Sequence, residues 1–379
     1  MIRFVLLVIS VLGVAQIPSR VHAQLFSEAQ GWGIKNKGPA SANGLVYFIR
    51  GYSNDILPGW NLVPYFLRSL NADGWDVIIN RINPKHTPNR ALGWPESRRA
   101  EIAQAIREAE QKLRNFRRQG YKTIIGAGHS FGAWTLLEVG ARNGALVDEL
   151  ILSAPSAHAR SLTQKGQPNP LFYELSAASK DRFSKLRTPT FVALFKDDEY
   201  EAPRRAELVS SVVAKNKMIY LVDRPAGFAG HFSAWTPIFD LIYGDCIAKL
   251  VQRAVLEACT RSVDANADWR SILGYDQIPT VMRKPVDAST LLGKQFVRYG
   301  LGHQNTFVTL QSNETVNVMS PMTRQRVALK TAATGRDGTS TFCLGSDCGR
   351  LVKWNDDVLL EFDVKGDALR YWWLREPPT

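Results

Sequence analysis

The sequence predicts an α/β fold with a mostly parallel central sheet and helices on both faces, followed by a small C-terminal antiparallel β domain. Two observations lead to this prediction. Strand-like apolar runs alternate with helical patterns from residue 44 to about 255, as in parallel sheets. From about residue 260, short alternating runs follow at roughly ten-residue spacing between Gly, Asn and Asp turns, as in antiparallel sheets.

The composition is that of a globular protein with a sizeable core. The chain has 379 residues, of which 45% are hydrophobic and 22% charged. Its formal net charge is +12, but the basic residues are interspersed with acidic ones and form no blocks with aromatic residues. We therefore expect no nucleic-acid partner, whereas association with the cell envelope stays open.

Residues 1–23 have the pattern of a secretory signal peptide. Arg3 supplies a positive start, residues 4–14 are apolar, and Val21-His22-Ala23 resembles a cleavage site. We expect an exported protein, periplasmic or secreted, whose mature chain begins after Ala23. An uncleaved membrane anchor is the alternative, although the apolar run is short for a bilayer span.

Four cysteines in an exported chain favour disulfides over a metal site. Cys343 and Cys348 are spaced to close a tight hairpin. Cys246 and Cys259 would then pair by elimination, but one continuous helix between them would hold them roughly 20 Å apart. Either that helix breaks or the two stay unpaired. No histidine lies at ligand spacing from these cysteines, so we expect no zinc.

The chain divides into a larger α/β domain at 24–258 and a small β domain at 265–379. In the first domain, apolar runs predict buried strands at 44–51, 75–79, 124–128, 150–154, 190–195 and 217–222. Periodicity predicts helices at 62–70, 96–118, from the serine turn to 139, and 204–214. Residues 156–187 are expected to be mostly irregular or weakly helical, in the place where a cap would lie.

A short run predicts a reactive serine. Residues 124–134 indicate a buried strand, a Gly-x-Ser-x-Gly turn and the start of a helix. Such a turn places a serine hydroxyl at the tip of a strained bend, where flanking glycines allow neighbouring backbone to pass closely. Ser130 is therefore the candidate nucleophile.

A nucleophilic serine needs a histidine base and a carboxylate that orients it. Of the six histidines, His231 lies in a glycine-containing loop after the last predicted strand, whereas His129 is inside the turn and expected to point away from the hydroxyl. The acidic loop after the strand at 190–195 offers the carboxylate. We choose Asp198, with Asp197 as the alternative, and the choice depends on loop register.

The oxyanion of such a reaction needs two backbone N–H donors. One is expected from Phe131, which follows the serine, and the other from Tyr52, in the turn after the first strand. Arg50, in that same turn, has two interpretations: contact with an anionic substrate, or a structural ion pair.

These features together resemble the α/β-hydrolase superfamily. The elbow Gly128-His129-Ser130-Phe131-Gly132, an acid after a later strand and His231 last reproduce its Ser, Asp, His order. The resemblance covers residues 44 to about 255. It implies a serine–histidine–acid triad and hydrolysis of an ester, amide or thioester without a cofactor. Arg50-Gly51 departs from the His-Gly of many members, and the β domain lies outside the resemblance.

The favoured function is an exported serine hydrolase, most simply a carboxylesterase acting on a small-molecule or acyl substrate. A peptidase or an acyltransferase would use the same triad, and the sequence does not separate them. A second class is a non-catalytic hydrolase-fold binding protein that acts through its C-terminal β domain. The oligomeric state is not predicted.

Overall fold

The computed structural model describes two regular regions, a parallel sheet with its helices and a C-terminal barrel. The described residues are 34–51, 64–80, 94–156, 170–195, 198, 216–223, 228, 230, 231, 233–253, 286, 288–300, 303–312, 315–319, 324–332, 341–344, 347–353, 358–362 and 368–375. The signal-peptide prediction, the helix predicted at 204–214 and the segment joining the two predicted domains lie outside them, so the boundaries at 258 and 265 stay predictions.

Within the described ranges, six parallel strands form the central sheet, in the order β2-β1-β3-β4-β5-β6. Their bounds are β1 (Leu45–Ile49), β2 (Asp76–Asn80), β3 (Ile124–His129), β4 (Glu149–Ser153), β5 (Thr190–Leu194) and β6 (Ile219–Asp223). The chain runs from β1 outward to β2 and then returns to the other side of β1 as β3. This reversal makes a switch point between β1 and β3, where open α/β sheets form their crevices.

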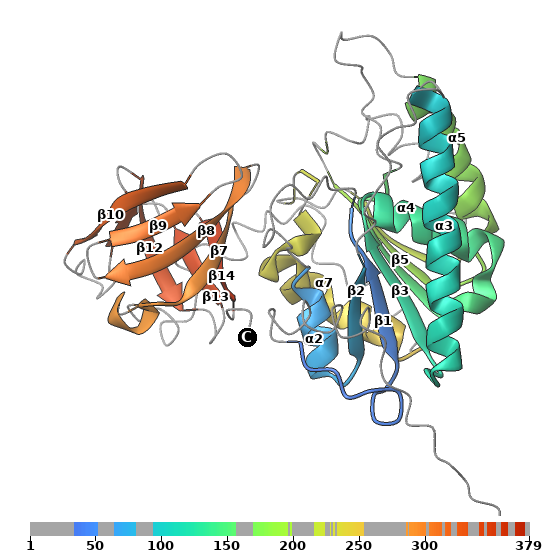
Figure 1. The fold of residues 1–379 in the computed structure, drawn as a ribbon, viewed down its shortest axis with the longest axis horizontal. Helices are drawn as coiled ribbons and strands as arrows, with labels where there is room; N and C mark the ends of the chain where they lie inside the picture. Colours follow the sequence, from blue (N-terminus) through green and yellow to red (C-terminus); the bar gives the residue numbers. More distant parts are fainter. Residues whose placement is uncertain are drawn as a thin grey trace, which may run out of the picture.

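Helices cover both faces of the sheet, as the sequence predicted (Figure 1). They are α2 (Phe66–Ala72), α3 (Trp94–Arg118), α4 (Phe131–Arg142), α5 (Pro170–Lys185) and α7 (Pro237–Val251), with short 3₁₀ turns η1 (Gly144–Leu146), η2 (Ser233–Trp235) and η6 (Ala288–Leu291). Helices α2 and α7 contact each other on one face, and α4 contacts both α3 and α5 on the other. Covering both faces explains why β1 to β5 are buried throughout.

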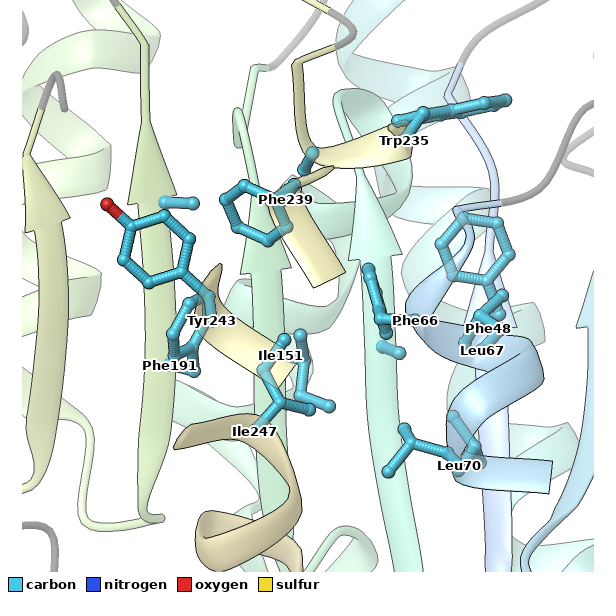
Figure 2. Packing of buried hydrophobic residues seen from close by; sticks show 14 of the residues in the cluster. Phe48, Phe66, Leu67, Leu70, Ile151, Phe191, Trp235, Phe239, Tyr243 and Ile247 are labelled. Atoms are coloured by element: carbon cyan, nitrogen blue, oxygen red, sulfur yellow. The ribbon is translucent and has the colours of Figure 1, made fainter. Parts of the chain in front are cut away.

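Alternate strand residues divide between two hydrophobic cores because successive side chains of a strand point to opposite faces. In β1, Val46 and Phe48 join the core under α2 and α7, which Figure 2 shows. Leu45, Tyr47 and Ile49 join the core under α3 and α4. The two cores pack against opposite faces of the sheet, and this packing holds the carboxyl ends of its strands in place.

Residues 170–185 correct the expected irregular stretch. They form the regular helix α5. Phe183 of this helix and Leu186, just after it, are buried in the core under α3 and α4. The helical periodicity was obscured by polar residues, because α5 exposes a wide solvent face. The cap prediction for the remainder of this segment concerns residues 157–169, which lie outside the described residues.

The C-terminal region is an antiparallel β structure, as predicted, and its described residues form eight strands that close into a barrel. The strands are β7 (Gln295–Gly300), β8 (His303–Ser312), β9 (Thr315–Met319), β10 (Arg324–Ala332), β11 (Thr341–Leu344), β12 (Asp347–Lys353), β13 (Val358–Phe362) and β14 (Ala368–Arg375). Each strand pairs with the next, and β14 pairs with β7. Closure therefore pairs both edges of each described strand of the barrel.

The barrel has its own core and a buried ion pair. Ten hydrophobic residues of its described part, Trp372 among them, are buried in this core. Arg298 donates two hydrogen bonds to Glu361, at 2.7 and 2.5 Å, and Trp372 Nε1 donates to the same carboxylate at 2.6 Å. The buried carboxylate is therefore neutralised and hydrogen-bonded, as burial of a charge requires.

The disulfide predicted from the hairpin spacing of Cys343 and Cys348 is present. Cys343 and Cys348 face each other across the β11–β12 hairpin and form a disulfide. Helix α7 ends at Val251, between Cys246 and Cys259, so the continuous helix that would separate the second pair is absent. Cys259 lies outside the described residues, and that pairing stays a prediction.

An apolar contact ties the barrel to the sheet domain. Val352 and Leu360 are paired across β12 and β13 and are 1% and 2% exposed. Their strand neighbours Leu351 and Leu359 belong to the barrel core, whereas Val352 and Leu360 belong to the core under α2 and α7. The outer face of the barrel is therefore docked on that side of the sheet, consistent with Figure 1.

None of the helices in the described ranges combines the length and the apolar character needed to cross a bilayer.

We expect Leu360→Asp to lower the free energy of unfolding by about 3 kcal/mol in urea denaturation, because it buries an unpaired charge at the docked face. Leu292, on the same domain, is 39% exposed. Leu292→Asp is the matched control and should stay within about 0.5 kcal/mol of the wild type. Equal losses in the two variants would contradict the docked arrangement.

The buried carboxyl group of Glu149 should make the free energy of unfolding depend on pH. Burial raises its pKa from 4.5 to about 7, and neither carboxylate oxygen has a hydrogen-bond partner among the described residues. Arg253 Nε lies 3.9 Å from Oε1. Because the folded state holds the proton more tightly, the contribution of neutral Glu149 is complete below about pH 4.5 and is lost as the pH rises through 7.

Glu149→Gln should therefore raise the free energy of unfolding at pH 8 by about 3 kcal/mol and change it little at pH 4.5. Denaturant unfolding at the two pH values measures both quantities, and the low-pH pair serves as the internal control. A stabilisation of the same size at both pH values would show that the carboxyl charge is not its cause.

Candidate active site

Ser130 occupies a strained bend between β3 and α4. Strand β3 ends at His129 and α4 begins at Phe131, so the turn is a single residue with φ 54° and ψ −122°. The Ser130 N–H donates to Ser153 O at 3.0 Å, and its carbonyl accepts from Trp134 N at 3.0 Å. A positive φ is uncommon for a serine, and these bonds hold the backbone in it.

The glycines of the turn are required by close backbone approach. A Cβ on Gly132 would lie 2.0 Å from Ile49 O and 2.5 Å from Arg50 O, and a Cβ on Gly128 would lie 2.6 Å from Ala133 N. No side chain fits at such distances. The first turn of α4 is thereby pressed against the end of β1.

The turn after β1 lies beside the serine, where the oxyanion site was expected. A Cβ on Gly51 would lie 3.0 Å from Ser130 Cβ and 3.5 Å from Ser130 Oγ. Phe131 is the first residue of α4, so its N–H belongs to the positive end of that helix. Tyr52, the other predicted donor, lies outside the described residues.

His231 and Asp198 come together from two loops. Asp198 follows β5, and His231 follows β6. His231 Nδ1 lies 2.8 Å from Asp198 Oδ2, and both side chains are buried. A carboxylate at Nδ1 fixes the ring orientation and places the proton of a neutral imidazole on that nitrogen. Asp197, the alternative acid, lies outside the described residues.

His129 connects the elbow to His231. Its ring centroid lies 4.6 Å from that of His231, and its Nδ1 lies 3.3 Å from Ser153 Oγ. Burial, followed by the charges of His231 and Arg50, holds the pKa of His129 well below 6.5. His129 is therefore neutral near pH 7, and the loop that carries His231 packs directly on the elbow that carries Ser130.

Trp235 and Arg50 extend this cluster and were not recognised together from the sequence. The Trp235 ring lies 5.0 Å from the His129 ring, edge to face, and Arg50 Cζ lies over the Trp235 ring at 5.8 Å. Figure 2 shows Trp235 beyond the tips of the strands. The one sequence signal was an aromatic residue four positions after His231, which spacing alone does not connect to Arg50.

No metal site is formed by the described part of the chain, where no group of three or more His, Cys, Asp and Glu side chains is placed to hold an ion. The chemical groups gathered at the carboxyl edge of the sheet are a hydroxyl, two imidazoles, a carboxylate and a guanidinium.

The sequence model of the alpha/beta hydrolase family matches residues 56–313, more than half of the chain. The chain belongs to the alpha/beta hydrolase family. The match begins after β1 and ends just beyond β8 of the barrel. A comparison with proteins of curated function found no match.

Solved structures of similar proteins include hydrolases. The Pyrococcus furiosus esterase Pf2001 is 13% identical, with 60% of this chain and 95% of that chain covered and a TM-score of 0.41. Est1E from Butyrivibrio proteoclasticus is 15% identical, with 58% and 90% covered and a TM-score of 0.35.

We expect Gly132→Ala to destabilise the fold by more than about 4 kcal/mol or to prevent folding, because its Cβ collides with the backbone of β1. The control is Gly38→Ala, which also alters a glycine but at φ +85° and with no atom within 4 Å. That variant should cost only about 1–2 kcal/mol. Denaturant unfolding of both variants tests the close approach, and a mild effect of Gly132→Ala would contradict it.

Proposed function

We propose that this alpha/beta hydrolase is an exported serine esterase that cleaves its substrate through an acyl-enzyme on Ser130. The observation that carries the proposal is the buried His231–Asp198 hydrogen bond of 2.8 Å, held against the strained turn of Ser130 by the His129 ring. Acyl transfer needs a base with an oriented ring near a nucleophilic hydroxyl, and the contact between the His129 and His231 rings supports such a placement of His231 near Ser130.

In the proposed reaction His231 Nε2 takes the proton from Ser130 Oγ as the oxygen attacks the acyl carbonyl. Asp198 stays ionised and stabilises the imidazolium through Nδ1. His231 then gives the proton to the leaving alcohol, and the acyl-enzyme forms. A water molecule, deprotonated by His231, releases the acid and restores Ser130.

Negative charge develops on the carbonyl oxygen during both steps. The Phe131 N–H, at the start of α4, is the proposed first donor to this oxygen. Gly51 brings the turn after β1 within contact of Ser130, which supports a second donor from that turn, predicted at Tyr52. Neutral His129 adds no positive charge that would oppose protonation of His231.

Export is supported by two independent features. The first 23 residues have a signal-peptide pattern, and Cys343 and Cys348 form a disulfide, which persists in oxidising compartments. We place the mature enzyme in the periplasm or outside the cell.

A fluorophosphonate probe tests the nucleophile on the full mature protein. We expect the wild type to be labelled at Ser130, and Ser130→Ala to lose the label and at least about 10³-fold of kcat on p-nitrophenyl esters. Ser184→Ala, an exposed serine on α5, is the matched control and should retain both. Mass spectrometry of the labelled peptide identifies the site.

The other outcomes distinguish the alternatives. Faster release from peptide amides than from esters would indicate a peptidase, and acyl transfer to an added amine or alcohol would indicate a transferase. A folded wild type with neither label nor turnover would contradict the proposal and favour a binding protein that acts through the barrel.

A further inference from the structure

Basic residues are concentrated at the edge of the sheet that lies opposite Ser130. The six described strands are parallel, so their amino ends lie together at one edge, whereas Ser130 lies at the carboxyl edge. Figure 2 shows the strands running away from the Leu70 end of α2 toward Trp235. In the described ranges, the turns at the amino edge carry six basic residues, Lys35, Lys37, Lys122, Arg187, Lys217 and Arg253, against two acidic ones, Asp73 and Asp148.

Contacts with the first residues of the strands place these turns. The Lys37 N–H donates to Oδ1 of Asp76, the first residue of β2, at 2.6 Å. Asp148, just before β4, accepts from the N–H of Ile124, the first residue of β3, at 2.8 Å. Arg253, after α7, donates to the same Asp148 carboxylate at 3.1 Å. The turns therefore meet at one edge although they are far apart in the chain.

Helix ends add to this positive charge. The last turns of α3, α4, α5 and α7 carry basic residues and no acidic ones: Arg117, Arg118, Arg142, Arg182, Lys185 and Lys249. Cations stabilise the carbonyl ends of helices, which is reason enough for this second set. It does not account for Lys35 and Lys37, because no described helix precedes them. The two sets together are called the amino-edge face.

The lysines of this face are available to a partner. Lys35, Lys37, Lys122 and Lys217 are exposed, and within the described part of the chain their side chains form no ion pair. The neighbouring carboxylate of Asp148 is already paired with Arg117 and Arg253 and leaves these lysines uncompensated.

The shape of the amino-edge face fits a planar partner. Six strands about 4.8 Å apart spread their turns over about 25 Å, and helix ends on both faces of the sheet widen this edge further. Cations spread in two directions can approach a plane together, whereas a single extended polymer would follow one row. Leu292, in the C-terminal region, is the exposed large hydrophobic residue among the described ones, so this face has no apolar anchor and its attraction is electrostatic.

The chain also enters the fold at this edge. The Lys35 N–H donates to Asn71 Oδ1 at 2.7 Å, near the end of α2, and Lys37 contacts the start of β2. The apolar segment at 4–14, which has a signal-peptide pattern, precedes this point in the chain. A segment directed to a membrane therefore joins the fold beside the amino-edge face.

We propose that the amino-edge face is an interaction surface for an anionic lipid membrane, which it binds through the phosphates of the headgroups. Lysine and arginine side chains near such a surface are attracted by its negative potential, and the attraction falls off within a Debye length. Adsorption at this face directs the opposite edge, with Ser130 and His231, away from the membrane and toward the aqueous phase. The inference does not depend on the reaction proposed for Ser130.

Vesicle sedimentation tests the proposal on the exported protein. The vesicles are pure phosphatidylcholine, or phosphatidylcholine with about 30% phosphatidylglycerol, in about 0.05 M or about 0.5 M NaCl. We expect the wild type to sediment with the anionic vesicles at low salt, and the high salt concentration to weaken this binding at least about 10-fold. Neutral vesicles should leave the protein in the supernatant.

Two triple variants of equal net charge separate this face from charge in general. Lys37→Gln/Lys122→Gln/Lys217→Gln should lower the partition coefficient about 30-fold or more, because each lysine contributes about fivefold. The matched control, Arg107→Gln/Lys180→Gln/Lys294→Gln, removes three exposed charges from the middle of α3, the middle of α5 and the C-terminal region. It should change the partition coefficient by less than about threefold. Urea unfolding of both variants at the wild-type midpoint shows that the fold is intact.

Three results would overturn the proposal. They are no sedimentation of the wild type with anionic vesicles at low salt, equal binding to neutral vesicles, and equal losses in the two triple variants. Dextran sulfate is titrated in parallel as a soluble polyanion. Its binding without sedimentation on vesicles would assign the amino-edge face to a soluble anionic polymer and overturn the membrane as partner.

Discussion

The close approach of the elbow to the end of β1 is the constraint on which the rest of the site depends. A Cβ on Gly132 would lie 2.0 Å from Ile49 O, so the start of α4 and the carboxyl end of β1 touch backbone to backbone. Ser130 lies between these two elements with a positive φ, and a Cβ on Gly51 would lie 3.0 Å from its Cβ. The proposed nucleophile and the turn after β1 are therefore placed beside each other by this close approach.

The two cores of the sheet domain make that condition possible. Side chains of β1 alternate between the α2/α7 core and the α3/α4 core, so the strand is clamped on both faces and its carboxyl end is rigid. The switch point of the sheet lies between β1 and β3, and in open α/β sheets the crevice for ligands forms there, at the carboxyl ends of the strands. Loops from β5 and β6 then bring Asp198 and His231 to this edge, and Trp235 places an aromatic ring beneath Arg50.

The barrel has a hydrophobic core separate from those of the sheet and contacts the sheet region through apolar side chains. It has its own core and a satisfied internal Arg298–Glu361 pair, and its Cys343–Cys348 bridge lies on one hairpin. Val352 and Leu360 instead turn outward into the α2/α7 core. The barrel thus adds buried apolar side chains to the core that also contains Ala234 and Trp235, which follow His231 in the chain.

The sequence by itself was enough to predict the alternation of strands and helices, the short antiparallel strands of the C-terminal region and the order of Ser130, an acid and His231 along the chain, because these follow from local periodicity and chain order. It missed α5, whose polar surface masked the helical period, and it left the barrel closure undetermined, because closure depends on pairing between distant strands β7 and β14. The cluster of His129, Trp235 and Arg50 was likewise decided only in the tertiary structure. Its members come from the end of β3, from η2 and from the turn after β1, and contacts between such distant segments are set by how the strands order in the sheet, which residue spacing does not encode.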